Sequence, residues 1–199
     1  MTPPLETAVP ISGHTQLVGL FGWPVEHSTS PQMHNAAFRA LGLDWCYLPF
    51  AVHPADIAAA LAGARALGLH GVNATVPHKV ALLPLVDELT PAARAIQAVN
   101  TVLFTHEHIL GHNTDAEGFI RALADEHLTP RGSHALLLGA GGAARAVAYA
   151  LASAGATITV LNRTPERANA LVEAIRAQVP GAQLCAGPLD AASIAHGPP

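Results

Sequence analysis

The sequence predicts an α/β protein of two domains, each built on a mainly parallel sheet covered by helices. Two observations favour this fold class. Short apolar runs alternate with longer amphipathic runs along most of the 199 residues, which is the pattern of repeated strand–helix units. The polar, turn-rich stretch DEHLTPRGS at residues 125–133 separates one series of such units from a second. We therefore expect domains at residues 1–125 and 126–199.

The first series is expected to form a three-layer α/β domain. Ser30 and Pro31 suit the N-cap and first turn of one helix, and Thr90 and Pro91 suit those of another. The expected elements are strands at residues 16–21, 45–52 and 70–76, helices at 30–42, 55–68, 76–89, 90–97 and 114–127, and a hairpin over 99–113.

The second series is shorter and more regular. The expected elements are a strand at residues 134–140, a helix at 142–155, a strand at 156–162, a helix at 164–178 and a weaker strand at 182–187. Because a helix follows each of the first two strands, the three strands should run parallel.

Composition disfavours several classes of function. The formal net charge is −4, with 10 Lys and Arg residues and no basic run, so we expect neither nucleic acid nor an anionic membrane as a partner. The two cysteines form no CxxC pair, which disfavours a disulfide framework and fits a reducing cytoplasm. The twelve histidines include no HExxH motif, so we expect no metal.

The apolar content does not indicate a membrane protein or a secreted one. The longest apolar run, residues 135–162, contains several glycines and Arg145, and we interpret it as strand, helix and strand. Residues 1–14 have neither a basic start nor an apolar stretch, so they do not predict a signal peptide. We expect a cytoplasmic protein.

The segment LLLGAGGAARAV predicts a dinucleotide-binding loop. It fits the pattern G-x-G-x-x-[G/A] at Gly139, Gly141 and Ala144, with a strand before it and a helix after it. Gly139 permits a tight turn, Gly141 lets a pyrophosphate approach the backbone, and Ala144 lets the helix pack close to the strand. The helix N-terminus then offers free N–H groups to phosphates. A glycine turn that merely joins a strand to a helix would look similar.

The end of the next strand favours NADP over NAD. NAD sites usually place a carboxylate about 20 residues after the first glycine, where it binds the ribose 2′-hydroxyl. Here that position is Asn162, and Arg163 and Thr164 follow it. Arg163 and Arg167 could hold a 2′-phosphate between them. The alternative is that both arginines are only a solvated helix start.

Polar side chains gather at the ends of several predicted elements in the first series, where open α/β sheets bind ligands. Hydroxyls and amides suit a small polyhydroxylated substrate, and two hydroxyls at a helix start suit a carboxylate. Taken singly, each residue could instead be only an N-cap, a turn residue or a solvated side chain. The candidates are Ser28, Ser30, Asn73, Thr75, Lys79, Asn100 and Asp115.

Six motifs carry a resemblance to a known family. In chain order they are HSTSPQMHNAAF, NATVPHK, AVNTV, HNTDAEGF, GAGGAARAV and NRTPERA. The chain resembles shikimate dehydrogenase, which catalyses the reversible NADP-dependent reduction of 3-dehydroshikimate to shikimate in chorismate and aromatic amino-acid biosynthesis. The resemblance implies an N-terminal substrate-binding domain, a Rossmann-type NADP-binding domain and an active site in the cleft between them.

The resemblance also implies roles for the candidate residues. Ser28 and Ser30 would bind the substrate carboxylate, and Asn73 would shape the pocket. The residues that would hold the ring hydroxyls are Thr75, Lys79, Asn100 and Asp115, with Lys79 and Asp115 as the acid–base pair. Those that would cradle the cofactor diphosphate are Gly139, Ala140, Gly141, Gly142 and Ala143. Those that would bind the 2′-phosphate are Asn162, Arg163, Thr164 and Arg167.

The resemblance implies that this chain lacks the C-terminal part of the family chain, as a truncated chain would. We therefore expect an incomplete Rossmann-type sheet with an exposed apolar edge. Two alternatives follow for function: a non-catalytic shikimate-binding fragment, and a quinate/shikimate dehydrogenase that uses NAD. Members of the family are monomers or homodimers, and the expected partner is the small-molecule substrate alone.

Overall fold

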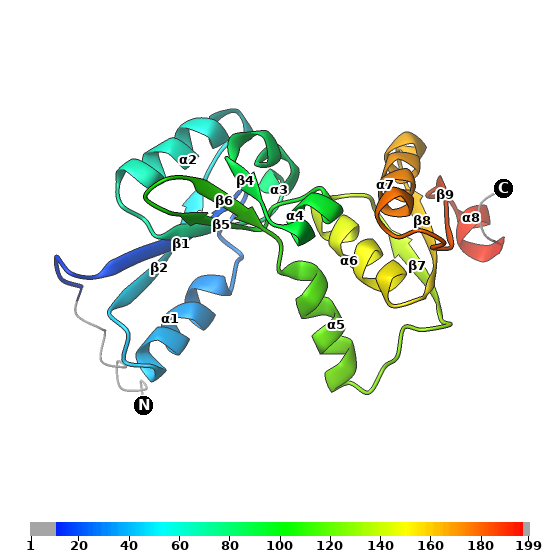
Figure 1. Ribbon diagram of the computed structural model, residues 1–199, viewed down its shortest axis with the longest axis horizontal. Helices are drawn as coiled ribbons and strands as arrows, with labels where there is room; N and C mark the ends of the chain where they lie inside the picture. The colour runs from blue at the N-terminus through cyan, green and yellow to red at the C-terminus, as the bar shows by residue number, and fades with distance from the viewer. Residues whose placement is uncertain (1–10, 197–199) are drawn as a thin grey trace.

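The computed structural model describes residues 11–196 and contains two separate sheets joined by a long helix (Figure 1). The N-terminal sheet has six strands and the C-terminal sheet has three. Residues 1–10, which belong to the stretch without signal-peptide features, lie outside the described residues. No helix within residues 11–196 has the length and apolar character that crossing a membrane requires.

The N-terminal half is a mixed sheet with the strand order β2-β1-β3-β5-β6-β4. Strand β1 pairs in parallel with β2 and β3, whereas β5 pairs antiparallel with β3 and β6. The elements are β1 (Gln16–Gly22), α1 (Ser30–Ala40), β2 (Trp45–Ala51), the 3₁₀ turn η1 (Pro54–Asp56), α2 (Ile57–Ala66), β3 (Gly71–Ala74), α3 (His78–Ala81), the 3₁₀ turn η2 (Leu83–Leu85), β4 (Glu88–Leu89), α4 (Pro91–Ile96), β5 (Thr101–Phe104), β6 (Ile109–His112) and α5 (Asp115–Asp125).

Helices cover both faces of this sheet, with α1 on one face and α2 on the other (Figure 1). Alternate residues of a strand point to opposite faces, and β1 follows this rule. Val18 and Leu20 pack with Phe38 of α1, while Leu17 and Phe21 pack in the cluster that contains Leu61 of α2 and several neighbours. The expected three-layer α/β arrangement is confirmed.

Details of the N-terminal half differ from the sequence-based expectation. The N-cap of α1 is Thr29, Ser30 is the first helical residue, and no side chain caps this end, so the assignment of Ser30 as N-cap was wrong. Helix boundaries are often displaced by one residue because the first turn has several polar candidates. The N-cap at Thr90 is confirmed, since its hydroxyl accepts a hydrogen bond from Ala93 N at 3.3 Å.

The C-terminal half is a parallel sheet with the order β7-β8-β9. Its elements are β7 (His134–Leu138), α6 (Gly142–Ser153), β8 (Thr157–Asn162), α7 (Pro165–Gln178), β9 (Leu184–Pro188) and α8 (Ala191–His196). The sequence analysis did not foresee α8. Fully buried Ile158 and Val160 of β8 pack in one cluster with Leu171 and Ile175 of α7, which holds this half together.

Strand β7 forms an edge of the three-stranded sheet and keeps apolar side chains exposed. Leu136 is 46% exposed and Leu138 is 59% exposed. Both lie on one face of β7, whose residues alternate between exposed and half-buried. This matches the expected exposed apolar edge of an incomplete Rossmann-type sheet.

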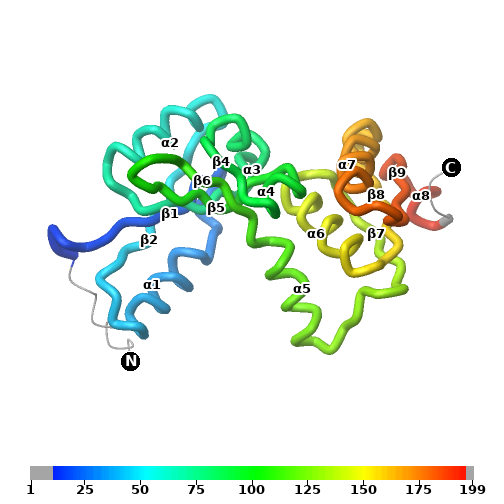
Figure 2. Tube along the Cα trace, in the orientation of Figure 1, coloured from blue at the N-terminus to red at the C-terminus, as the bar shows by residue number. Residues whose placement is uncertain are grey.

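Helix α5 joins the two halves and packs along α6, and α4 also contacts α6 (Figure 2). Small residues allow this close approach: Ala116 of α5 and Ala146 and Ala150 of α6 pack with Ile96 of α4. These contacts bring the N-terminus of α6 close to the edge of the six-stranded sheet.

Candidate active site

The polar candidates of the N-terminal half gather at one edge of the six-stranded sheet. Strands β1 and β3 are parallel, with Phe21 paired to Ala74, so both end at this edge. Strand β5 runs the other way and starts there, since Thr101 pairs with Asn73. Strand β6 returns to the same edge, where His112 pairs with Thr101. Four segments separated in sequence thereby place their polar residues together.

Lys79 and Asp115 form an ion pair at this edge. Lys79 Nζ donates to Asp115 Oδ2 at 2.6 Å, and the two side chains are 13% and 27% exposed. Helix α3 carries Lys79, whose backbone carbonyl accepts from Val99 N at 2.7 Å. Of the three N–H groups of the Lys79 ammonium, only the one to Asp115 has a protein partner among residues 11–196. The remaining two can hold an oxygen of a ligand.

Asn100 fixes the other side of the Asp115 carboxylate. Its Nδ2 donates to Asp115 Oδ1 at 2.7 Å and to Thr114 Oγ1 at 2.9 Å. Its Oδ1 accepts from Thr114 N at 3.0 Å and from Thr101 Oγ1 at 2.9 Å. Asn113 Oδ1 in turn accepts from Asp115 N at 2.9 Å. The carboxylate is therefore held by two side chains, those of Lys79 and Asn100, and cannot turn freely.

Asn73 and Thr75 lie at the end of β3. Asn73 Nδ2 donates to Asn100 O and to Thr101 Oγ1, at 3.2 and 3.1 Å. Thr75 N donates to Phe21 O at 2.9 Å, which ties the end of β3 to the end of β1. A Cβ on Gly22 would lie 2.7 Å from the Thr75 methyl, so glycine at this position permits the close approach.

Ser28 and Ser30 lie where the chain passes from β1 into α1. Ser28 Oγ accepts from Ser30 N at 3.2 Å, and both residues are half-buried. The loop before them is tied to the segment before Lys79, since Trp23 N donates to Val76 O at 3.0 Å. The structure places the two serines at the same edge of the sheet as Lys79, without a direct contact between them and Lys79.

The glycine loop lies directly against Lys79. A Cβ on Gly142 would lie 2.7 Å from Lys79 Cβ, whereas a Cβ on Gly139 or Gly141 would meet nothing within 4 Å. Gly139 has φ +108°, in the region that favours glycine, and α6 begins at Gly142. The loop therefore leaves space beside Gly139 and Gly141, where a phosphate would approach. At Gly142 it packs closely against Lys79.

A cavity of about 540 Å³ lies between α3 and the glycine loop. Lys79, Gly141, Arg145 and Arg167 are among its lining residues. Arg145 is half-buried, and burial lowers the pKa of its guanidinium. Neither Arg145 nor Arg167 has an ion-pair partner among residues 11–196. Unpaired cations around an open glycine loop fit an anionic ligand such as a dinucleotide diphosphate.

The four residues expected at the 2′-phosphate lie together at the turn after β8. Asn162 ends β8, and its Nδ2 donates to Thr164 O at 2.9 Å. Arg163 and Thr164 are exposed in the turn, and Arg167 follows in the first turns of α7. Of the four, only Arg167 lines the cavity beside Lys79. No carboxylate occupies the turn.

Several residues of the site were missed by sequence reasoning. Thr101 and Asn113 stand inside motifs that were singled out, but their roles depend on contacts across β5, β6 and α5. Thr114 was considered only as an N-cap, yet it makes no side-chain cap and accepts from Asn100. Gly142 was assigned to the diphosphate, but its lack of a side chain also lets Lys79 pack closely against the loop. No sequence signal could have identified Tyr47, whose hydroxyl donates to Asn73 Oδ1 at 2.9 Å.

The fold and site together define an α/β protein of two sheets in which a Rossmann-type glycine loop meets a half-buried lysine–aspartate pair. Residues 20–102 match the family described as shikimate dehydrogenase substrate binding domain. Residues 122–186 match the family described as shikimate / quinate 5-dehydrogenase.

The chain is similar to the shikimate dehydrogenase (NADP(+)) of Geobacter metallireducens, with 52% identity over 182 residues, 90% of this chain and 64% of that relative. A shikimate 5-dehydrogenase from Thermus thermophilus, solved with NADP(H) and shikimate, has 41% identity and a TM-score of 0.76; the match covers 85% of this chain and 62% of that one. A quinate dehydrogenase from Corynebacterium glutamicum, solved with NAD, has 33% identity and a TM-score of 0.80, covering 91% and 67%.

This chain belongs to the shikimate dehydrogenase family. It spans 64% of the length of the Geobacter relative and 58% of a 54%-identical shikimate dehydrogenase from Methanothermobacter thermautotrophicus. The six-stranded sheet corresponds to the substrate-binding part, and the glycine loop lies in the part matched to the dehydrogenase description.

Proposed function

We propose that this chain carries the catalytic centre of an NADP-dependent shikimate dehydrogenase, an oxidoreductase that reversibly reduces 3-dehydroshikimate to shikimate. One observation supports it above the others: the Lys79–Asp115 pair, joined at 2.6 Å, packs against the glycine loop. A proton-transfer group therefore lies beside the place where a dinucleotide would bind, as oxidation of an alcohol requires.

Oxidation of a secondary alcohol separates a hydride from a proton. NADP, when bound, would supply the hydride acceptor. The proton of the hydroxyl would pass to the Lys79–Asp115 pair as the carbon–oxygen double bond forms. In the reverse direction the Lys79 ammonium would polarise the ketone oxygen and return the proton, while Asp115 holds the ammonium in place.

The substrate contacts are also proposals, and the geometry of the edge supports them. Thr75, Asn100 and Asp115 would hold ring hydroxyls together with Lys79, and Asn73 would shape the pocket. Ser28 and Ser30 would bind the carboxylate at the start of α1, where backbone N–H groups and hydroxyls are available. The spacing of these groups along one sheet edge suits a small ring with a carboxylate at one end.

The cofactor contacts are likewise proposals that the geometry supports. The residues proposed to cradle the diphosphate are Gly139, Ala140, Gly141, Gly142 and Ala143, and those proposed to bind the 2′-phosphate are Asn162, Arg163, Thr164 and Arg167. Arg163 in a turn without a carboxylate, and Arg167 in the first turns of α7, favour NADP over NAD.

Two organisational proposals accompany this one. The two separate sheets support domains at residues 1–125 and 126–199, with the boundary after α5. The free cysteines, Cys46 and Cys185, support a reducing cytoplasm. A monomer or homodimer remains a prediction from the family.

The alternative of a non-catalytic shikimate-binding fragment is favoured by two observations. The chain spans less than two thirds of the Geobacter relative, and β7 lies at the edge of its sheet with exposed Leu136 and Leu138. If the cofactor half needs further strands, substrate would bind without turnover. The NAD-dependent quinate alternative is favoured only by the likeness to the Corynebacterium protein.

The test is NADPH formation from shikimate and NADP by the purified chain, with Lys79→Ala beside it and quinate with NAD as the second pair of substrates. We expect turnover in the wild type that falls by at least about a hundredfold in the variant, because a positioned proton-transfer group contributes about that much. Near-full turnover in Lys79→Ala would refute the proposed role. Shikimate binding without turnover would favour the fragment.

A further inference from the structure

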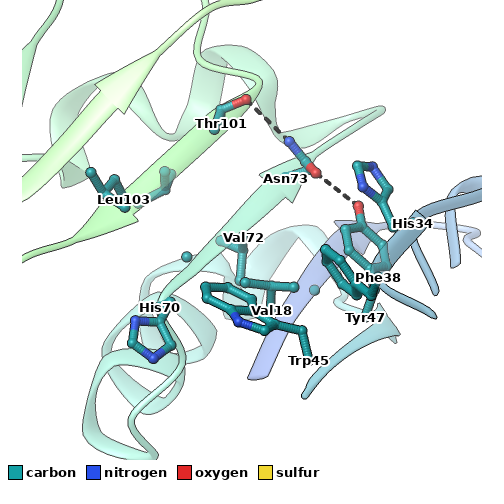
Figure 3. Close-up of a pocket in the computed structure, with 13 residues that line it drawn as sticks. Val18, His34, Phe38, Trp45, Tyr47, His70, Val72, Asn73, Thr101 and Leu103 are labelled. Atoms are coloured by element: carbon teal, nitrogen blue, oxygen red, sulfur yellow. Dashed lines mark hydrogen bonds between the residues drawn. The ribbon is translucent and has the colours of Figure 1, made fainter. Parts of the chain in front are cut away.

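Three groups of contacts hold Tyr47 on β2, a strand that β1 separates from β3. Its ring stacks on His34 of α1, with the ring centroids 4.4 Å apart and the planes at 8°. Asn35 of α1 donates to Tyr47 O at 2.9 Å and accepts from Tyr47 N at 2.8 Å. The tyrosine hydroxyl donates to Asn73 Oδ1 at 2.9 Å (Figure 3). Only 3% of the residue is exposed.

A continuous series of hydrogen bonds runs from this hydroxyl to the Asp115 carboxylate. Tyr47 donates to Asn73, Asn73 donates to Thr101 at 3.1 Å, and Figure 3 shows both bonds. Thr101 donates to Asn100 at 2.9 Å, and Asn100 donates to Asp115 at 2.7 Å. We call these five residues the amide relay.

Groups with a fixed hydrogen-bonding role set the direction of the amide relay. Asp115 can only accept when ionised, and the backbone N–H of Thr114 can only donate. They fix Nδ2 and Oδ1 of Asn100, so the Thr101 hydroxyl must donate to Asn100 Oδ1. The Thr101 oxygen then accepts from Asn73 Nδ2, whose second hydrogen goes to the carbonyl of Asn100.

Asn73 Oδ1 is consequently left as an acceptor that needs one donor, and Tyr47 supplies it. Burial raises the pKa of Tyr47 to about 12, so the hydroxyl keeps its proton over the working pH range. Without this donor the oxygen of the half-buried Asn73 amide would lose its hydrogen-bond partner. A turn of the Asn73 amide would then take the hydrogen bond away from Thr101 and loosen Asn100.

We propose that Tyr47 is a positioning residue for the acid–base pair: its hydroxyl fixes Asn73 and, through Thr101 and Asn100, the orientation of the Asp115 carboxylate that holds Lys79. This inference rests on the proposed function for its catalytic meaning, while the orientation of the amides is independent of it. Tyr47 also connects α1, which begins at Ser30, to the residues proposed to bind the ring hydroxyls. The groups proposed for the carboxylate and for the hydroxyls of a substrate are therefore both held in place by Tyr47.

The first experiment needs no turnover. The side-chain amide resonances of Asn73 and Asn100 are recorded by ¹H–¹⁵N NMR in the wild-type chain, in Tyr47→Phe and in Trp45→Phe. Trp45 is the matched control, since it lines the same pocket but makes ring contacts with Phe38 and His70 and takes no part in the amide relay. We expect both amides to shift in Tyr47→Phe, with Asn100 unchanged in Trp45→Phe.

The second experiment measures shikimate oxidation by the same three proteins, with their melting temperatures. We expect kcat of Tyr47→Phe to fall about tenfold, because misplaced catalytic groups lose rate, while KM for NADP stays unchanged and Trp45→Phe keeps its rate. A Tyr47→Phe protein that melts like Trp45→Phe but loses rate separates positioning from folding.

The outcomes distinguish this inference from the proposed function. An Asn100 amide that does not respond to Tyr47→Phe overturns the amide relay, whatever the rates. An amide that shifts without any loss of kcat overturns the positioning role. A wild-type chain with neither turnover nor a shikimate-induced shift refutes the proposed function, and the NMR comparison then still decides whether Tyr47 orients Asn100.

Discussion

The proposed acid–base site and the glycine loop lie side by side but are built in opposite ways. Around Asp115, nearly every polar side-chain atom has a protein partner, and the bonds form a connected set. Around Gly141, the backbone is open and the lining cations Arg145 and Arg167 lack a partner among residues 11–196. The first region is organised by the protein alone, whereas the second is arranged for a ligand that brings its own charge.

The largest expected effect compares the same substitution in the two regions. Asn100→Ala should lower the free energy of unfolding by about 2–4 kcal/mol, because it removes the side-chain hydrogen bonds that the buried Asn100 makes to Asp115, Thr101 and Thr114. Asn162→Ala removes one bond to Thr164 O in an exposed turn, and should cost less than about 1 kcal/mol. Urea unfolding of both variants measures the difference. Equal losses of unfolding free energy in the two variants would contradict the expected difference between the regions.

A second comparison tests the contact between the two regions, where Gly142 meets Lys79. Gly142→Ala should lower the free energy of unfolding by about 1–2 kcal/mol, because the new methyl meets Lys79 Cβ at 2.7 Å. Gly118→Ala on α5, where a Cβ meets nothing within 4 Å, should instead stabilise the chain by up to about 1 kcal/mol through helix propensity. Thermal melting checks both signs, and a neutral Gly142→Ala would mean that Lys79 can move aside.

A third comparison tests the unpaired cations. Arg163→Gln should weaken NADPH binding about tenfold, since it removes a charge-assisted contact to the 2′-phosphate, and leave NADH binding unchanged. Arg167→Gln should weaken NADPH binding more than NADH binding, because Arg167 also lines the cavity beside the glycine loop. Fluorescence titration with both nucleotides measures this. Arg121→Gln on α5 is the control, because Arg121 is already paired with Glu117. Equal losses for the two nucleotides would refute the 2′-phosphate assignment.

The smallest effect concerns pH and the residue next to Lys79. His78 is 1% exposed, its Nε2 donates to Val52 O at 2.9 Å, and its Nδ1 has no hydrogen-bond partner within residues 11–196. Burial is the main cause that lowers its pKa below 6.5. The folded state therefore resists protonation, so stability is complete above pH 6.5 and falls as the pH drops through 6.5 towards the folded pKa.

Urea unfolding between about pH 5 and 7.5 tests this expectation. His78→Phe should flatten part of the acid decline, although the loss of the bond to Val52 lowers its stability at neutral pH. Burial also lowers the pKa of His34, which adds a decline of the same sign, so the difference between wild type and variant isolates His78. An unchanged acid slope in the variant would contradict the assignment.

The fold was largely predictable because its signals are local. Apolar strands such as β1 and β8, the cap at Thr90 and the glycine loop can be predicted from neighbouring residues. Short elements such as β4 and α8 were missed, since two or six residues carry too little pattern to compete with a turn. The N-cap of α1 was misplaced by one residue for a similar reason, because Thr29 and Ser30 are equally suitable caps.

The sequence alone determined the chemistry that is available: an open glycine loop, arginines in place of a carboxylate after β8, and Lys79 and Asp115 in motifs of the shikimate dehydrogenase family. Only the tertiary structure decided which of these groups touch. The contact between Lys79 and Asp115, the approach of Gly142 to Lys79, and the path from Tyr47 to Asn100 all join residues from different elements. Such contacts depend on strand order and register, which bring residues distant in sequence to one edge of the sheet. A local sequence pattern therefore does not predict them.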